Sequence, residues 1–283
     1  MYNYLCKIIF ENKKETNNMK IFISADMEGV AGVTTWESTR YGGQGYEEAC
    51  RLMTREVAAA CEAVTESGGQ AVVKDGHEDA VNIDIEALPE GTRLIRGWMT
   101  SPEGMMGGLD ETFDGVIYIG YHSPAGMNTS PLTHTVEYSW FNWVKLNGRL
   151  ASEFSLNAVY ADSLGVPSLF ISGDSGICRH AGELYKDIAT VSTKECTGNA
   201  TCSIHPDEAV KMIKEGVKKA VSRIKKPAPR DGRMLLEMNF KDHQKAKAAS
   251  YYPGAVLSDC NTVTYTAENV KDFMIAKMFM FEI

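Results

Sequence analysis

The stretch that decides the fold is KIFISADMEG, residues 20–29. Its first six positions form a short apolar run, which predicts a buried β-strand over residues 20–25. Asp26 and Glu28 follow directly, at the point where this strand ends. In a parallel sheet the carboxyl ends of the strands share one edge, and ligands bind there. We therefore expect this pair of carboxylates to lie at a ligand-binding edge.

The same arrangement recurs twice further along the chain. Residues 70–74, QAVVK, predict a second strand that leads into Asp75, Gly76 and His77. Residues 115–120, GVIYIG, predict a third strand that leads into Tyr121 and His122. Helix-length segments separate these runs, which indicates parallel β-α-β units. The two imidazoles should thus meet the carboxylates of the first strand at one edge.

Two more residues complete the candidate site. Glu153 lies at the predicted start of a helix over residues 153–164, where it could instead stabilise the helix dipole. His134 lies in a loop twelve residues after His122, and could be an acid–base group, a third imidazole ligand or an ordinary loop histidine. Carboxylates placed side by side repel each other unless a cation or a proton lies between them. Carboxylate oxygens and imidazole nitrogens are ligands of zinc, so the joint pattern predicts one mixed metal site.

The overall fold class is predicted to be α/β, with a mainly parallel sheet flanked by helices and a smaller C-terminal α/β unit. We expect three parts: residues 1–18 as an extension or tag, residues 19–185 as the metal-site α/β domain, and residues 186–283 as a smaller α/β unit. The terminal helix is expected to return to the first domain. The other predicted elements include a helix over 46–67, strands over 92–95 and 167–172, a strand pair over 136–150 that turns at Asn147-Gly148, and helices over 207–226 and 270–281.

Composition excludes several classes of partner. The 283-residue chain is 44% hydrophobic and 23% charged, which is ordinary for a globular protein. A net charge of −8 argues against nucleic acid or an anionic membrane as the main partner. No apolar stretch approaches 18 residues, so we expect no membrane span. The seven cysteines are scattered without a Cys-x-x-Cys pair, which predicts reduced thiols and a cytoplasmic protein.

An ordered set of motifs resembles the DppA-type D-aminopeptidase family, from Met19 to nearly the end of the chain. The set is specific because its members occur in a fixed order. It comprises Ser24-Ala25-Asp26-Met27-Glu28-Gly29, Asp75-Gly76-His77, Gly108-Leu109-Asp110 with Phe113, Gly120-Tyr121-His122, Thr133-His134-Thr135, Glu153 with Leu156-Asn157-Ala158, and Gly173-Asp174. The sequence departs from the family pattern between His122 and His134 and at Ser152, on the substrate side of the predicted site.

The resemblance implies a zinc-dependent aminopeptidase, a metalloprotease that removes N-terminal residues from short peptides, with D-amino-acid peptides as candidate substrates. It implies two zinc ions per subunit. Asp26 would bridge them, Glu28 and His77 would complete one site, and His122 and Glu153 would complete the other. His134 would be the catalytic histidine. The resemblance also implies a homo-oligomer, expected to be a homodecamer with its sites facing a central channel.

Two alternatives stay open at this point. One is a metal-dependent amidase or deacylase that acts on another small amide with the same metals. The other is a metal-dependent binding or assembly protein without turnover. The presence of all five ligand-type residues together with His134 favours an enzyme. Metal identity is open as well, since Mn²⁺ or Co²⁺ can occupy a site of this type.

Overall fold

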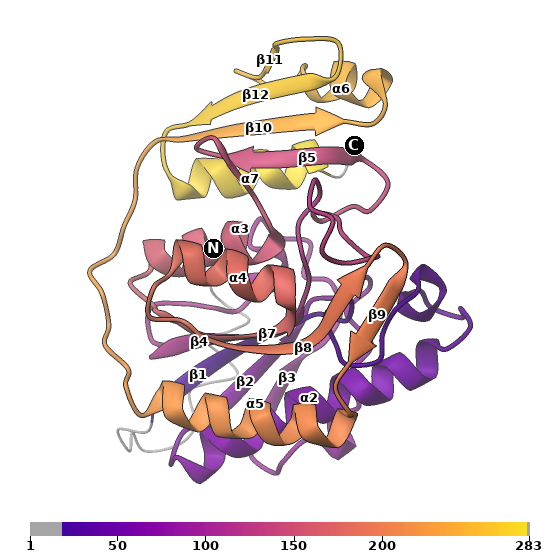
Figure 1. The fold of residues 1–283 in the computed structure, drawn as a ribbon. Helices are drawn as coiled ribbons and strands as arrows, with labels where there is room; N and C mark the ends of the chain where they lie inside the picture. Colours follow the sequence, from indigo (N-terminus) through magenta and orange to yellow (C-terminus); the bar gives the residue numbers. More distant parts are fainter. Residues whose placement is uncertain (1–18, 282–283) are drawn as a thin grey trace.

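The computed structural model describes residues 19–281, and its main feature is a seven-stranded sheet, here sheet A (Figure 1). Its order is β3-β2-β1-β4-β7-β8-β9, and only the last pair is antiparallel. The strands are β1 Lys20–Ala25, β2 Gln70–Asp75, β3 Arg93–Ile95, β4 Gly115–Tyr121, β7 Ser168–Asp174, β8 Ala189–Thr197 and β9 Ala200–Ser203. The mainly parallel α/β fold expected from the sequence is confirmed.

Helices cover both faces of sheet A, which explains why β1 is apolar at successive positions. Ile21 and Ile23 belong to the core on one face, and Phe22 belongs to the core on the other. α2 and α5 contact the strands on the first face, while α3 and α4 contact them on the second (Figure 1). The helices are α2 Tyr46–Glu66, α3 Glu153–Ser163, α4 Ser175–Leu184, α5 Pro206–Val221, α6 His243–Ala249 and α7 Val270–Phe281, with short 3₁₀ helices η1 Trp36–Thr39, η2 Ile85–Ala87 and η3 Gly104–Met106.

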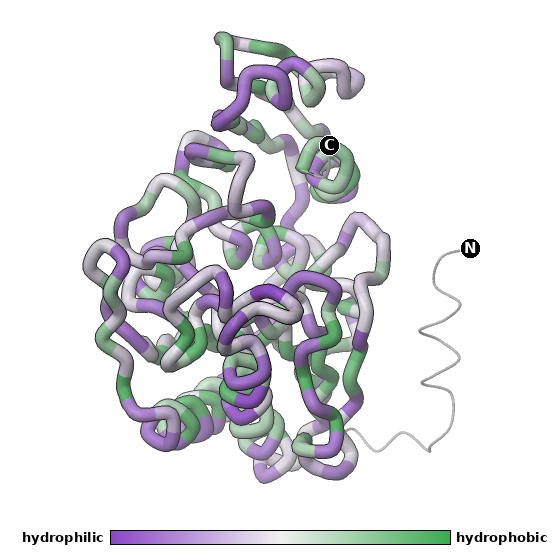
Figure 2. The backbone as a smooth tube through the Cα atoms, turned by 90° about the vertical axis from the view of Figure 1, so that its right-hand side faces the viewer, coloured by the Kyte–Doolittle hydropathy of each residue, from purple (hydrophilic) through white to green (hydrophobic). Residues whose placement is uncertain are grey.

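A second sheet, here sheet B, is antiparallel and has the order β11-β12-β10-β5-β6. Its strands are β5 Phe141–Leu146, β6 Arg149–Leu150, β10 Met234–Phe240, β11 Val256–Leu257 and β12 Thr262–Ala267. Leu236 and Phe240 of β10 pack with Phe273 of α7 in a separate apolar core. Figures 1 and 2, which differ by a quarter turn, both show this unit at one end of the molecule, with α7 between it and the larger body.

The two sheets do not divide the chain at residue 186. β8 and β9 come after that residue but extend sheet A, whereas β5 and β6 come before it and belong to sheet B. The physical reason is long-range pairing: β5 forms its ladder with β10, about ninety positions later, and no local pattern encodes that choice. The predicted turn at Asn147-Gly148 is present, with φ of 51° and 77°. Residues 1–18 lie outside the described residues, so their assignment stays a prediction.

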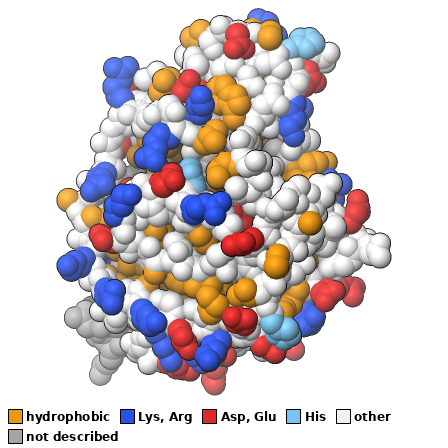
Figure 3. Space-filling model, in the orientation of Figure 1, with side chains coloured by type: hydrophobic (Ala, Val, Ile, Leu, Met, Phe, Trp, Pro, Cys, Tyr) orange, Lys and Arg blue, Asp and Glu red, His pale blue; other side chains and the backbone are white. Residues whose placement is uncertain are grey.

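Helix α5 carries four lysines, and carboxylates of α2 pair with two of them. Lys214 pairs with Glu62 and Glu66 of α2 at 2.7 and 2.8 Å, and Lys218 pairs with Glu66. Figure 3 shows basic and acidic side chains mixed along the edge of the molecule where α5 lies. This arrangement is typical of a solvated helix face rather than of a binding patch. Among the helices of residues 19–281, none is long and apolar enough to cross a membrane.

Candidate metal centre

The candidate site lies where the strand order of sheet A changes direction. β2 and β3 lie on one side of β1, and β4 lies on the other, so β1 and β4 flank a topological switch point. Asp26 and Glu28 follow β1, and His122 follows β4. The two loops pack closely here, because a Cβ on Gly29 would lie 1.8 Å from the Tyr121 carbonyl oxygen. Only glycine permits this approach, which sets the carboxylates against the end of β4.

His77 faces both carboxylates of the first loop. Its Nδ1 lies 3.3 Å from Asp26 Oδ1 and 3.1 Å from Glu28 Oε2. On the other side of the ring, Nε2 lies 2.6 Å from the carbonyl oxygen of Thr39. A carbonyl can only accept, so in the neutral imidazole the proton belongs on Nε2 and the lone pair on Nδ1. A second partner of this kind orients the imidazole of a metal-binding histidine.

His122 faces Asp26 from the opposite side. Its Nε2 lies 3.5 Å from Asp26 Oδ2 and 3.3 Å from Glu153 Oε1. Its Nδ1 lies 3.0 Å from the carbonyl oxygen of Ser123, which assigns the proton to Nδ1 and the lone pair to Nε2. Asp26 therefore has one oxygen toward His77 and the other toward His122. Asp26 thus lies between the two imidazoles.

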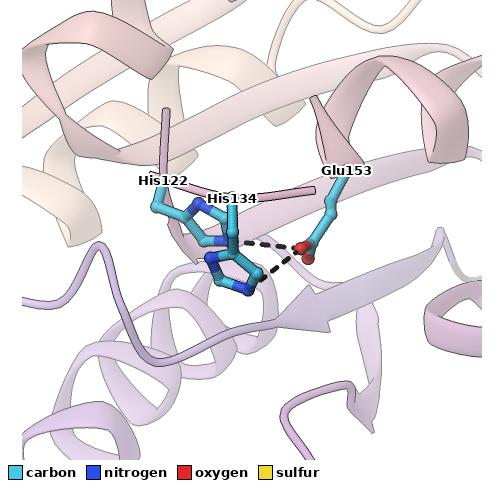
Figure 4. Close-up of side chains that lie close together, drawn as sticks. All are labelled: His122, His134 and Glu153. Atoms are coloured by element: carbon cyan, nitrogen blue, oxygen red, sulfur yellow. Dashed lines mark ion pairs between the residues drawn. The ribbon is translucent and has the colours of Figure 1, made fainter. Parts of the chain in front are cut away.

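His134 stacks on His122, as Figure 4 shows, with ring centroids 4.1 Å apart and planes 5° apart. Its Nε2 lies 3.5 Å from Glu153 Oε1, and its Nδ1 lies 2.9 Å from the carbonyl oxygen of Leu132. The proton again belongs on Nδ1, so Nε2 can accept one. The rings of Trp36 and His134 pack in an edge-to-face arrangement, at a centroid distance of 5.2 Å. The loop that carries His134 thus folds back over the site.

Several carboxylates and imidazoles are buried together at the site, and this shifts their pKa values. Burial, together with Glu28 and Glu153, raises the pKa of Asp26 to about 7. Burial alone would lower the pKa of His122, but Glu153 and Asp26 outweigh it and raise that pKa to about 10. Burial and the neighbouring His122 lower the pKa of His134. His122 in turn lowers the pKa of Glu153 to about 2, against the effect of burial.

Three atoms at the centre of this group are left without a hydrogen bond. Asp26 Oδ2, Glu28 Oε2 and His122 Nε2 are buried and have no hydrogen-bond partner among residues 19–281, the described part of the chain. Buried polar atoms normally have a partner, because an unpaired one costs about 1–3 kcal/mol. Divalent cations bound among these oxygen and nitrogen atoms would satisfy all three. The donor set therefore fits a metal such as zinc.

The ligand-type atoms form two overlapping groups. One group contains Asp26, Glu28 and His122, and the other contains His122, His134 and Glu153; within each, the atoms lie within 4.8 Å of one another. The structure thus brings together all six residues singled out from the sequence. It also places His134 beside His122 and Glu153, close enough to be a ligand.

A buried lysine, which no sequence motif indicated, holds in place the loop after β1 that carries Asp26 and Glu28. Lys194 of β8 is 2% exposed, and its Nζ donates to the carbonyl oxygens of Glu28, Val30 and Val33 at 2.5, 3.2 and 2.5 Å. Glu56 of α2 accepts from the backbone N–H of the same loop at Ala31, at 2.9 Å. In the sequence, no motif or spacing distinguishes Lys194 from the other lysines. Only its long-range contacts reveal the role.

Two buried aspartates support the histidine loops in a similar way. Asp75 accepts from the backbone N–H groups of Asn82 and Ile83 at 2.7 and 3.0 Å, which closes the loop that carries His77. Asp174 accepts from the backbone N–H of Ser123 at 2.8 Å, next to His122. Both aspartates end a strand of sheet A. The sequence predicted that both aspartates lie beside the site. Their hydrogen-bond partners are known only from the structure.

Strained backbone also contributes to the site. Val136 has a φ of 66°, a conformation that is unfavourable for a β-branched residue. Its N–H donates to Glu153 Oε1 at 2.7 Å. Strain of this kind costs on the order of 1–3 kcal/mol and persists only where surrounding contacts enforce it. Here it orients the Glu153 carboxylate toward His122 and His134.

Comparison with known proteins agrees with this geometry. The curated D-aminopeptidase of Bacillus subtilis (strain 168) is 28% identical over 271 residues, covering 94% of this chain and 97% of that protein. A solved structure, the Zn-dependent D-aminopeptidase DppA from Bacillus subtilis, a self-compartmentalizing protease, superposes with a TM-score of 0.86 at 27% identity, covering 93% of this chain and 97% of the other. The family model described as D-aminopeptidase matches residues 19–279. This chain belongs to the D-aminopeptidase family.

Proposed function

We propose that this protein is a zinc-dependent aminopeptidase that removes N-terminal residues from short peptides, including peptides of D-amino acids. The observation that carries the proposal is the buried cluster at the switch point of sheet A, in which Asp26 lies between His77 and His122. The Zn-dependent relative has the same fold over nearly the whole chain, which supports zinc as the metal.

The residues present suit two zinc ions per subunit. Asp26 would bridge the ions, Glu28 and His77 would complete one site, and His122 and Glu153 would complete the other. The proton assignments support this division, since the lone pairs of His77 Nδ1 and His122 Nε2 both face Asp26. When bound, zinc supplies Lewis-acid polarisation of the scissile carbonyl and lowers the pKa of a water molecule.

His134 is the residue that we assign to proton transfer. Its Nδ1–H is directed to Leu132, and its lowered pKa keeps Nε2 unprotonated at neutral pH. Nε2 can therefore accept a proton from the water molecule that attacks the peptide carbonyl, and then donate it to the leaving amine. Stacking on His122 and contact with Trp36 restrict the ring to this orientation. Water access is limited as well, since His134 is only 8% exposed.

The test combines metal analysis with a substrate panel. Purified protein is expected to contain up to two equivalents of zinc by elemental analysis. Zinc-loaded protein is then assayed on matched D- and L-aminoacyl peptides, on simple aminoacyl amides and on N-acyl amides, before and after chelation. Hydrolysis restricted to N-acyl amides would assign a deacylase instead. Zinc binding without turnover on any member would assign a binding protein.

The proposal includes an assembly and a location. The DppA relative is self-compartmentalizing, which supports a homo-oligomer, and we propose a homodecamer with the sites facing an internal channel. If light scattering gave the mass of a monomer at micromolar concentration, the proposed decamer would be wrong. The six cysteines within residues 19–281 are all free thiols, which supports the proposed cytoplasmic location. Fractionation of cells that express the protein would test that location.

A further inference from the structure

A cavity of about 360 Å³ opens beside the candidate metal centre, and helix α3 supplies part of its wall. Glu153 lies in this wall, and so does Asn157, four positions later on the same helix. Residues at this spacing lie on the same face of a helix, one turn apart. Neither metal binding nor proton transfer, as proposed above, involves Asn157. Its carboxamide is nevertheless a polar group beside the Glu153 carboxylate.

Behind this wall, buried groups form a chain of hydrogen bonds that has a single direction. Ser24 Oγ donates to the carbonyl oxygen of Met105 at 3.0 Å, and a carbonyl can only accept. Ser24 has no second proton, so Tyr121 is the donor in the 2.7 Å contact between the two hydroxyls. The Tyr121 oxygen then accepts from Asn157 Nδ2 at 3.0 Å. The Met105 carbonyl at one end of the chain thus fixes the orientation of the carboxamide at the other.

This orientation uses the donors of Asn157 and leaves its acceptor free. Besides Tyr121, Nδ2 lies 3.4 Å from Met105 Sδ, which is a weak acceptor. Oδ1 accepts no hydrogen bond from any part of the chain between residues 19 and 281, and it is not sealed from solvent. Asn157 as a whole is only 2% exposed, and it lines the cavity. Oδ1 is therefore an acceptor that the cavity can reach.

An acceptor held in this way suits an N–H group of a bound substrate. The contact with Tyr121 prevents free rotation of the carboxamide, so little ordering of Asn157 is needed when a ligand binds. The enclosed position also strengthens a hydrogen bond relative to one in water. A peptide has two kinds of N–H beside its scissile carbonyl, those of the α-amine and that of the scissile amide. Either one is a donor of the required type.

We infer that Asn157 is a substrate-binding residue, whose Oδ1 accepts a hydrogen bond from an N–H beside the scissile carbonyl. The inference rests on the proposed function, since it adds a residue to the same site. Tyr121 and Ser24 act through Asn157 as positioning residues, because their hydroxyls hold the carboxamide in place. Asn157 takes no part in bond cleavage and binds no metal.

The test removes the acceptor from the protein and the N–H from the substrate in turn. Zinc-loaded wild type is compared with Asn157→Leu, in which a side chain of similar volume has no polar atom. The probes are alanine N-propylamide, alanine propyl ester, which lacks the amide N–H, and Nα,Nα-dimethylalanine propylamide, which lacks the N–H groups of the neutral amine. Each is used in the D and L series. The measured quantity is kcat/KM, or the inhibition constant of a probe that is not hydrolysed.

The propylamide should lose about three- to tenfold in Asn157→Leu, the usual effect of one hydrogen bond. If the scissile amide is the donor, the ester should show a wild-type-to-variant ratio of about one. If the α-amine is the donor, the dimethylated probe should show that ratio instead. Equal losses for all three probes, or no loss for the propylamide, would overturn the inference. Lower zinc content in Asn157→Leu would overturn it too, because Asn157 would then support the metal centre.

Two further variants keep the test decisive if Asn157→Leu does not fold. Tyr121→Phe leaves the acceptor in place but frees the carboxamide to rotate, so the propylamide should lose activity while the N–H-deficient probe does not. An unchanged propylamide value in Tyr121→Phe would then overturn the inference. Ser163→Ala is the matched control on α3, because its hydroxyl donates only to the carbonyl oxygen of Tyr160 at 2.7 Å and lies outside the cavity wall.

A binding measurement separates this inference from the proposed function. If the wild type hydrolyses none of the three probes, the proposed function fails, and calorimetry with the same probes measures the ratios for binding alone. A preference for the propylamide over one N–H-deficient probe, lost in Asn157→Leu, would still support the role of Asn157. Hydrolysis by the wild type without any such preference would leave the proposed function standing and refute the role of Asn157.

Discussion

The carboxyl edge of sheet A and the core beside sheet B bury opposite kinds of groups. At the carboxyl edge of sheet A, Asp26, Glu28 and His122 are at most 3% exposed, and each has a buried atom without a hydrogen bond within the described residues. In sheet B, Leu236 and Phe240 are fully buried in an apolar core. Apolar burial stabilises the fold directly, whereas buried charge requires a partner. This difference distinguishes the candidate metal centre from the apolar core that stabilises the fold.

The largest effect should come from the carboxylate between the two imidazoles. Asp26→Ala is expected to abolish hydrolysis and to lower zinc affinity by more than about 100-fold, since even outer partners of metal ligands contribute about 10- to 100-fold. Elemental analysis and competitive chelator titration measure the affinity. Asp79→Ala, an exposed acid in the next loop, is the control. Zinc content equal to that of the wild type would show that Asp26 is no bridge.

The second prediction divides the site into ligands and a catalyst. His134→Ala should lower kcat by about 10²- to 10⁴-fold, the usual range for a general acid–base group, and leave zinc content near that of the wild type. Elemental analysis and hydrolysis of an aminoacyl amide are measured on the same sample. Loss of zinc would make His134 a ligand, as its proximity to His122 and Glu153 permits. Full activity would make it an ordinary loop histidine.

The third prediction concerns the apolar core beside sheet B. Leu236→Ala in β10 should lower the free energy of unfolding by about 2–5 kcal/mol through loss of buried apolar contacts. Zinc affinity of the folded protein should not change, because sheet B contributes none of the six site residues. Denaturant titration gives the first quantity and chelator competition the second. A fall in zinc affinity as large as that in Asp26→Ala would show that the two regions are not separable.

The smallest effect is predicted for Lys194, a buried residue that holds the loop of Glu28 in place. Lys194→Met should weaken zinc binding by about 10- to 100-fold, since the variant no longer ties the carbonyl of Glu28 to β8. Unfolding is measured in parallel, and Lys194→Arg, which keeps the charge and donors, should recover part of the affinity. If stability falls while zinc affinity is unchanged, Lys194 supports the fold only.

Much of sheet A could be predicted because its signals are local. The strand over 20–25 and the strand over 115–120 are continuous apolar runs, and polar ligand-type residues follow each of them directly. Glycine ends α2, and the Asn147-Gly148 turn forms as predicted. Helix α4 and strand β9 were not predicted, because α4 is short and β9 is formed from residues without an apolar alternation.

What the sequence alone determined was the fold class and the six residues of the site, because hydrophobic period, turn residues and ligand chemistry are properties of short segments. The tertiary structure decided which strands share a sheet, how Asp26 faces both His77 and His122, and that Lys194 binds the metal loop. It also decided that α7 brings Lys277 into the wall of a cavity that Glu153 lines. These depend on contacts between residues up to about 170 positions apart, and such contacts form only when the whole core packs together.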